Sequence, residues 1–523
     1  PNAATPASAP AAERCPPARA LTAGPVKRKL RAESETMAER NPSLPTKPYA
    51  GRKIHFVGIG GCGMCGLAEF VLLEGGEVSG SDRKESAATE RLRRLGARVS
   101  IGHSADHVPA GAERVVASAA VPPDNPELAE ARGRGIPVEK YARFLGRLME
   151  LRRGIAVAGT HGKSTTTAMT GFVLRQAGLD PSFIIGADVP QLGGASHVGT
   201  GPHLVVEACE FDRSFLNLAP QAACILNVEE DHLDYYRDLA EIREAFADFA
   251  SRVSPGGRLV VSGTDRAFPR LTESARAAVE TFGIGGRWYW RAENLEADRG
   301  RFAFDVYRGR DLFGSVQLKI PGQHHVLNAL VAVALCYWAG APAAAVVEAL
   351  GAFEGASRRT EVLGEAAGVT VVDDYAHHPT EILATLRAVR QRFEPKRLWV
   401  VFQPHQHSRT RFLLKDFARA LVLADKVIVP DIYFVRDSEL ERQAVRSQDL
   451  VGEIQGLGAD ALYMESFDSI RRYLVESLAA GDVLTVMGAG DVWRLGAPVL
   501  ADLERGSAPT RKEPTERANL EGT

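Results

Sequence analysis

Gly154-Ile-Ala-Val-Ala-Gly159-Thr-His-Gly162-Lys163-Ser164 joins an apolar run to a glycine-rich loop, and a Thr-rich segment follows it. The run Gly154–Ala158 predicts a buried strand, and the Thr-rich segment predicts a helix. The loop is shorter than a full P-loop, because only two residues separate its glycines. Its working parts are nevertheless present: backbone donors, Lys163 for the β and γ oxygens of ATP, and the Ser164 hydroxyl for Mg²⁺.

Outward from this segment, short β-branched runs alternate with helical patterns, which is typical of parallel α/β domains. Upstream, the sequence predicts a strand at Lys53–Gly58, a helix at Met64–Glu74 and a strand at Glu77–Ser81. Downstream, it predicts packed helices in Val326–Leu350 and strands at Val369–Asp373, Leu398–Phe402, Lys426–Val429 and Val483–Met487.

The length of 523 residues predicts three domains, at about 150 residues each. We place the boundaries near Arg152 and Gly355. The expected parts are a disordered leader (1–50), a Rossmann-like domain (51–151), a central P-loop ATPase-type domain with a mainly parallel sheet (152–355), a second Rossmann-like domain (356–503) and a disordered tail (504–523).

Composition excludes several classes of protein. Lys and Arg number 63 against 65 Asp and Glu, a balance that is unusual for a nucleic-acid-binding protein. No apolar run approaches the roughly 18 residues that a membrane span needs. The six cysteines are sparse and no secretory signal is evident, so we expect a cytoplasmic protein.

A second glycine-rich loop, Gly58-Ile-Gly60-Gly61-Cys-Gly63, follows the first predicted strand. Such a loop allows a tight turn and offers a helix N-terminus to a diphosphate. Asp82 ends the next strand at the distance where dinucleotide enzymes bind a ribose hydroxyl. Taken alone, this pattern predicts a nicotinamide-dependent oxidoreductase, although any diphosphate would satisfy it.

Two further predicted strands end in acidic residues. Leu204–Asp212 carries Glu207, Glu210 and Asp212, and Cys224–Asp234 ends in a series of acids around His232. Clustered carboxylates repel one another unless a cation lies among them, and Mg²⁺ prefers such oxygens. The alternative for either segment alone is a solvated acidic loop; beside a phosphate-binding loop, we expect a metal site.

These motifs are similar to those of the Mur ligase family. GTHGKSTTT, EACEFD and NVEEDHLD, which begin at Gly159, Glu207 and Asn227, resemble its central ATPase domain, and Gly58–Glu69 resembles the nucleotide-sugar loop of its alanine-adding members. The resemblance spans Arg52 to about Leu503 and continues through Ser118–Glu127, Gly322–Asn328, Ser357–Glu361, Asp373–Ile382 and Phe402–Arg411.

The resemblance implies an ATP-dependent ligase that joins the carboxylate of UDP-N-acetylmuramate to L-alanine through an acyl phosphate, in peptidoglycan precursor synthesis for the cell wall. It implies ATP and two Mg²⁺ as cofactors, small-molecule partners only, and a monomer or homodimer. The alternative within the family is a recycling ligase that attaches L-alanyl-γ-D-glutamyl-diaminopimelate to the same nucleotide sugar.

The resemblance also implies the residues of each site. The catalytic residues would be Lys163, His232, Arg359, His378 and Arg409. ATP would contact Gly159, Thr160, His161, Gly162, Lys163, Ser164, Thr165, His324, Asn328, Arg359 and Asp374. The nucleotide sugar would contact Gly58, Gly60, Gly61, Gly63, Met64, Asp82 and Ser118. The amino acid would contact Tyr375, His378, His405 and Arg409, and the metal ions would contact Ser164, Glu207 and His232.

The sequence departs from the family pattern at three places. His325 stands where the family has Asn, and Gln406-His407 stands where it has Arg-Tyr. The helix at Ile242–Phe249 lacks the lysine that members adding later amino acids carry, which suits the alanine-adding branch. Because Gln406 removes a cation, we expect weaker affinity for alanine unless His405 or His407 replaces it.

Overall fold

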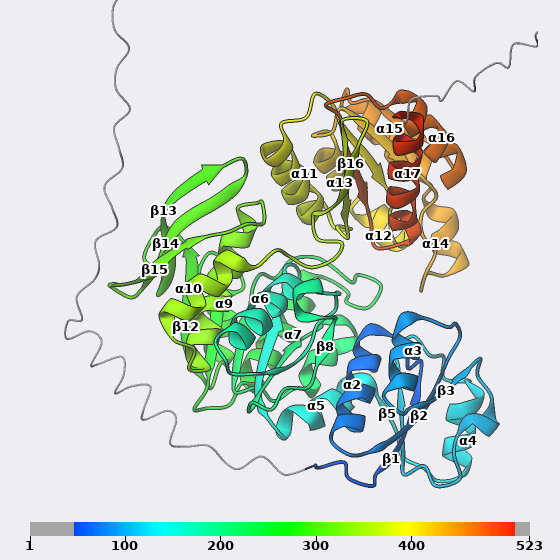
Figure 1. Cartoon of the computed structure of the whole chain (residues 1–523), viewed down its shortest axis with the longest axis vertical. Helices are drawn as coiled ribbons and strands as arrows, with labels where there is room; N and C mark the ends of the chain where they lie inside the picture. The colour runs from blue at the N-terminus through cyan, green and yellow to red at the C-terminus, as the bar shows by residue number, and fades with distance from the viewer. Residues whose placement is uncertain (1–46, 508–523) are drawn as a thin grey trace, which may run out of the picture. The chain divides into compact units, whose positions relative to one another are not determined.

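The computed structural model describes residues 47–507, which form three sheets with flanking helices (Figure 1). The prediction of an α/β fold is confirmed. Each sheet lies inside one of the three domain ranges expected from the sequence. Residues 1–46 and 508–523, most of the expected leader and tail, lie outside the described residues. Tyr49, within the expected leader, packs its ring 5.8 Å from that of Phe144.

The N-terminal sheet is parallel throughout, with the order β3-β2-β1-β4-β5. The order reverses between β1 and β4, and at such a switch point the carboxyl ends of the strands leave a crevice for a ligand. The strands are β1 (Lys53–Val57), β2 (Glu77–Asp82), β3 (Arg98–Ile101), β4 (Arg114–Ala117) and β5 (Val138–Lys140). The α-helices are α2 (Cys62–Leu73), α3 (Ala87–Arg94), α4 (Pro126–Gly133) and α5 (Tyr141–Glu150).

The central sheet has ten strands in the order β15-β14-β13-β12-β11-β10-β6-β9-β7-β8. Its parallel strands are β6 (Arg153–Ala158), β7 (Ser182–Ile184), β9 (His203–Glu207), β10 (Ala222–Ile225), β11 (Arg258–Ser262), β12 (Ala278–Ile284) and β13 (Trp290–Asp298). Antiparallel strands are added at both edges: β8 (Ser196–His197), β14 (Arg301–Arg308) and β15 (Asp311–Gln317). The antiparallel extension β13–β15 was not predicted from the sequence.

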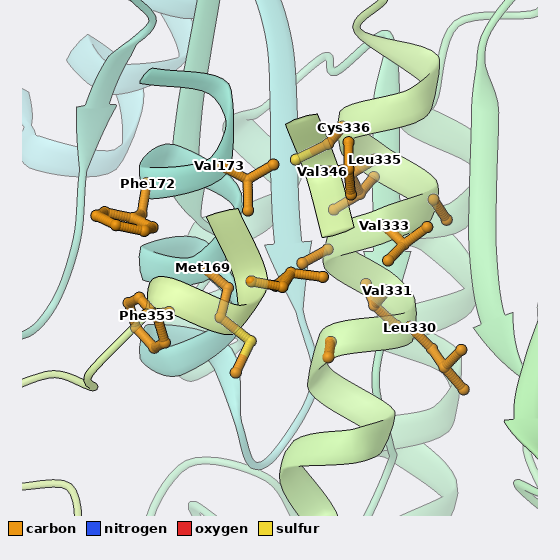
Figure 2. Close-up of a cluster of buried hydrophobic side chains, with 14 of the residues drawn as sticks. Met169, Phe172, Val173, Leu330, Val331, Val333, Leu335, Cys336, Val346 and Phe353 are labelled. Carbon is orange, nitrogen blue, oxygen red and sulfur yellow. The ribbon is translucent and has the colours of Figure 1, made fainter. Parts of the chain in front are cut away.

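Helices cover this sheet: α6 (Lys163–Gln176), α7 (Leu239–Arg252), α8 (Phe268–Ser274), α9 (His324–Trp338) and α10 (Ala343–Ala352). In Figure 2, Met169, Phe172 and Val173 of α6 lie among apolar side chains of α9 and α10. Because α9 is apolar on nearly all sides, it is stable only when other elements surround it. Each buried aliphatic side chain contributes about 1.5–3 kcal/mol, so this packing fixes the start of α6, where the phosphate loop ends.

The C-terminal sheet has the order β16-β17-β21-β18-β19-β20, and only the β16–β17 pair is antiparallel. Its strands are β16 (Glu361–Ala366), β17 (Val369–Asp374), β18 (Leu398–Phe402), β19 (Lys426–Val429), β20 (Ala461–Tyr463) and β21 (Val483–Met487). Its α-helices are α11 (Pro379–Phe393), α12 (His407–Phe412), α13 (Leu414–Leu421), α14 (Glu439–Ala444), α15 (Ser447–Gly456), α16 (Phe467–Ser477) and α17 (Gly496–Ser507). Between residues 47 and 507, no helix is both long and apolar enough to cross a lipid bilayer.

Candidate active site

The phosphate loop, residues 159–164, connects β6 to α6. Gly159 and Gly162 have φ angles of 139° and 83°, a region that favours glycine. The loop is held from the neighbouring strand end: Asn227 Oδ1 accepts the backbone N–H of His161 at 2.8 Å, and the carbonyl of Asn227 accepts that of Thr160 at 3.0 Å. Its backbone N–H groups and the N-terminus of α6 form a site suited to phosphate.

Lys163 is held by acceptors on two strand ends. Its Nζ donates to the carbonyls of Gly159 and Thr160, at 2.6 and 3.0 Å, and to Glu210 Oε1 at 2.9 Å. Burial alone would lower the pKa of Lys163, but the carboxylate of Glu210 outweighs this effect and raises it. Lys163 therefore remains charged, as phosphate binding requires. Glu210 was expected only as one of the clustered acids of a metal site; its pairing with Lys163 was not expected.

Glu210, Asp231 and His232 form a cluster whose ligand atoms lie within 4.8 Å of one another. Glu210 Oε2 and His232 Nδ1 are buried without a hydrogen-bond partner. Burial lowers the pKa of His232, which keeps its imidazole neutral and able to donate a lone pair. Two carboxylates and a neutral imidazole fit a divalent cation.

The metal residues expected from the sequence are only partly in this cluster. His232 belongs to it, whereas Glu207 accepts a hydrogen bond from the backbone N–H of Gly186, and Ser164 Oγ accepts one from Arg359 Nη2 at 3.3 Å. Thr165, next to Ser164, is buried in the first turn of α6. The structure therefore groups His232 with Glu210 and Asp231, which lie in the two acidic segments where a metal site was expected but were not among the three named ligands.

His161 links the phosphate loop to the C-terminal domain. Its Nδ1 lies 3.2 Å from Glu381 Oε1 of α11, and its Nε2 lies 3.5 Å from Glu229 Oε2. Burial would lower the pKa of His161, but the proximity of these two carboxylates raises it to about 9. Thr380 Oγ1 also donates to Glu229, at 2.6 Å. Glu229 and Glu381 both lie in the family-like segments, at Asn227–Asp234 and Asp373–Ile382, but no role was expected for either.

His378 is occupied by backbone contacts. Its Nδ1 accepts the backbone N–H of Thr380 at 3.3 Å, which caps α11. Its Nε2 therefore carries the proton and donates to the carbonyl of Glu230 at 3.0 Å. The adjacent His377 instead has its ring 5.4 Å from Tyr375 and 6.2 Å from His405. The sequence could not show which of two neighbouring histidines faces the expected amino-acid pocket.

Arg409 is buried in an ion pair with the central domain. Its Nε and Nη2 donate to Asp231 Oδ1 at 3.1 and 2.6 Å, and its Nη1 lies 3.2 Å from His405 Nδ1. Burial would raise the pKa of Asp231, but Arg409 holds it well below its usual range. The adjoining cavity, lined by residues including Asp231, His232 and Arg409, has a volume of about 10 Å³. That volume holds about one water molecule, so an amino acid needs the domains to separate before it enters.

The remaining ATP residues expected from the sequence approach the loop from α9 and from the segment before β16. Asn328 lies close to Gly162, since a Cβ added there would be 2.8 Å from Asn328 Oδ1. His325, where the family pattern has Asn, bonds to Asn328 at 3.2 Å, and its ring centroid lies 4.0 Å from that of His324. Asp374 accepts from the backbone N–H groups of Thr360 and Ala376, both at 2.7 Å, and so fixes the segment that carries Arg359.

The expected nucleotide-sugar residues lie at the switch point of the N-terminal sheet. Asp82 Oδ2 accepts the backbone N–H of Gly60 at 2.9 Å, so this carboxylate also shapes the loop. A Cβ on Gly63 would lie 2.6 Å from Tyr141 Oη, and one on Gly58 (φ 78°) would lie 3.0 Å from Ser118 Cβ, so both positions require glycine. Gly61 precedes α2 as its N-cap, and Met64 is buried within it.

Comparisons with known proteins cover all three domains. Family models described as "Mur ligase family, catalytic domain", "Mur ligase middle domain" and "Mur ligase, glutamate ligase domain" match residues 53–153, 157–336 and 358–490. The UDP-N-acetylmuramate–L-alanine ligase of Caldanaerobacter subterraneus subsp. tengcongensis is 42% identical over 453 residues, which are 86% of this chain and 98% of that protein.

Two crystal structures are also similar. The UDP-N-acetylmuramate–alanine ligase of Thermotoga maritima matches with a TM-score of 0.73 and 30% identity, over 87% of this chain and 99% of that one. A murein peptide ligase from Psychrobacter arcticus matches with a TM-score of 0.66 and 26% identity, over the same shares of the two chains, 87% and 99%. With three family models in chain order over most of its length, the chain belongs to the Mur ligase family.

Proposed function

We propose that this chain joins L-alanine to the lactyl carboxylate of UDP-N-acetylmuramate, with hydrolysis of ATP to ADP and phosphate. One observation carries the proposal: the cluster around Lys163, Glu210 and His232 adjoins the Asp231–Arg409 pair, so phosphate-activating groups lie next to the expected amino-acid pocket. Relatives that carry the L-alanine ligase name, at about 42% identity, support alanine as the acceptor.

In the first step, a carboxylate oxygen of the nucleotide sugar attacks the γ-phosphorus of ATP. The bond from that phosphorus to the bridging oxygen breaks, leaving an acyl phosphate and ADP. Phosphoryl transfer needs mainly positioning and neutralisation of charge. The Lys163 ammonium supplies a positive charge, and the donors of the phosphate loop orient the phosphates. Arg359, whose guanidinium reaches Ser164, adds a second cation from the C-terminal domain.

In the second step, the neutral amine of L-alanine attacks the acyl carbonyl. The bond from that carbon to the phosphate oxygen breaks, phosphate leaves, and the amine loses a proton as the amide forms. Water would hydrolyse the acyl phosphate, so the C-terminal domain must enclose it first. The contacts of Arg359, Thr380 and Arg409 with the central domain are those of an enclosed state.

The donor set fits Mg²⁺, which would neutralise developing charge on the phosphates. Glu210, Asp231 and His232 would hold one ion, and Ser164 with Glu207 would hold a second beside the phosphate loop. We place the reaction in the cytoplasm, where ATP and the nucleotide sugar are available. We also propose that the enzyme acts on small molecules as a monomer or homodimer.

Mass spectrometry of the product tests this function. The chain is incubated with ATP, Mg²⁺, UDP-N-acetylmuramate and L-alanine, with L-alanyl-γ-D-glutamyl-diaminopimelate as the alternative acceptor. We expect UDP-N-acetylmuramoyl-L-alanine, and far less product from the tripeptide. Preferred use of the tripeptide would make this chain a recycling ligase. Binding of NAD without binding of UDP-sugar would instead favour an oxidoreductase.

A further inference from the structure

We propose that Arg436 binds the carboxylate of the amino-acid substrate and so selects a free amino acid. This role rests on the proposed function and goes beyond it, because Arg436 is not among the residues that the sequence motifs indicated. Arg409, the arginine expected to bind this carboxylate, is already occupied. Its side chain is only 6% exposed, and all three of its guanidinium nitrogens face Asp231 or His405.

Arg436 lies on the loop before α14, which is held against the segment before α12. Tyr433 N donates to the carbonyl of Pro404 at 2.8 Å, and Gln406 N donates to the carbonyl of Tyr433 at 3.1 Å. Asp437 accepts from the backbone N–H of His407 and, at 2.6 Å, from Ser408 Oγ. These contacts on both sides of Arg436 fix its backbone beside the Arg409 segment.

Neighbouring groups hold the guanidinium of Arg436 in place, but not all of its nitrogens have hydrogen-bond partners in the described residues. Its Nη2 donates to Gln406 Oε1 at 3.2 Å, its Nε lies 3.8 Å from Asp234 Oδ2, and its carbon centre lies 4.3 Å from the ring centroid of Phe211. Its Nη1 has no hydrogen-bond partner in the described part of the chain. The side chain is 35% exposed, so a carboxylate has access to it. An arginine with free donors, supported by an aromatic face, is suited to bidentate carboxylate binding.

Gln406 connects this arginine to the acidic segment of the central domain. Its Oε1 accepts from Arg436 while its Nε2 donates to Asp234 Oδ2 at 3.1 Å. Gln406 and Arg436 both have positive φ angles, 71° and 62°, which are strained for residues other than glycine, and such strain concentrates at functional sites. Gln406 stands where the family pattern has an arginine, so in this chain a guanidinium reaches that place from another loop.

Steady-state kinetics with L-alanine and L-alaninamide test the proposal, because the amide lacks the carboxylate. For Arg436→Ala we expect KM for L-alanine to rise about 10- to 100-fold, the loss expected for one charge-assisted contact. The kcat and the KM values for ATP and UDP-N-acetylmuramate should stay within about twofold. The preference for L-alanine over L-alaninamide should largely disappear, and Gln406→Arg in the Arg436→Ala background should restore it.

Arg442→Ala is the matched control, because Arg442 is exposed on the adjacent α14 and its guanidinium lies 5.1 Å from the ring centroid of Phe434. It should leave the preference unchanged. If Arg436→Ala does not fold, Arg436→Lys keeps the charge without the planar fork and should give an intermediate preference. An unchanged preference in either soluble variant of Arg436 would overturn this assignment alone. Failure of the wild-type chain to use any amino acid would overturn the proposed function as well.

Discussion

Arg409 donates from Nε and Nη2 to the same oxygen of Asp231, although 178 residues separate the two in sequence. Both side chains are almost fully buried, at 6% and 7% exposure. The pair joins the C-terminal domain to the strand end that carries His232. It therefore makes the candidate metal cluster and the expected amino-acid pocket depend on each other.

A double-mutant cycle measures this dependence. Asp231→Asn or Arg409→Gln alone leaves a buried group without its partner, so each should reduce kcat/KM strongly. Expressed as a free energy, the loss of kcat/KM in the double variant should be smaller than the sum of the two single losses, by a coupling energy of about 1–3 kcal/mol. The exposed pair Arg390–Asp425 is the control and should couple by about 0–1 kcal/mol. Purely additive losses at Asp231 and Arg409 would show that the pair does not act as a unit.

Lys163→Ala should abolish turnover while leaving the binding of UDP-N-acetylmuramate intact, because the two phosphate sites lie on different sheets. Removal of Lys163 also leaves Glu210 buried without its counter-charge, so Lys163→Ala/Glu210→Gln should recover stability without activity. Lys319→Ala, an exposed lysine paired with Glu354, should change neither property. Isothermal titration calorimetry decides between the outcomes: loss of nucleotide-sugar binding in Lys163→Ala would refute the two-site assignment.

His161 should make stability depend on pH above neutrality. Its pKa is raised from 6.5 to about 9 in the folded chain, so the folded state holds this proton more tightly. The resulting stabilisation is complete below pH 6.5 and is lost as pH rises through 9. The thermal unfolding midpoint of the wild-type chain should therefore fall between pH 7 and about pH 9.5.

His161→Gln should remove most of this fall in the unfolding midpoint. Glu381→Gln removes one of the two carboxylates, so the fall should occur at lower pH. Differential scanning fluorimetry across this range is sufficient. If the unfolding midpoint falls equally steeply with pH in the wild type and in His161→Gln, other groups cause the pH dependence.

Local pattern predicted much of the fold. The expected strands Leu398–Phe402, Lys426–Val429 and Val483–Met487 have the bounds of β18, β19 and β21, because each is a short apolar run buried on both faces of a parallel sheet. The extension β13–β15 was missed. Its strands are partly exposed, so they lack a continuous apolar run.

Residues of the candidate site could be predicted only where a recognisable sequence motif contains the chemically active side chain. Lys163 and His232 lie in such motifs, and the structure places both beside Glu210. Glu381 and Arg436 come from the C-terminal domain, and only the folded chain shows which charges they face. The expectation that Gln406 weakens alanine binding remains a prediction. Arg436 gives a physical reason to expect a smaller effect, because its guanidinium lies beside Gln406 and supplies the missing cation.

The central claim is that ATP cleavage is coupled to amide formation between two specific substrates. The most direct measurement is phosphate release from ATP and Mg²⁺ with UDP-N-acetylmuramate and L-alanine, each omitted in turn. We predict rapid release only when all are present, with one amide formed per phosphate. Equally rapid release without the nucleotide sugar or without L-alanine would contradict the account.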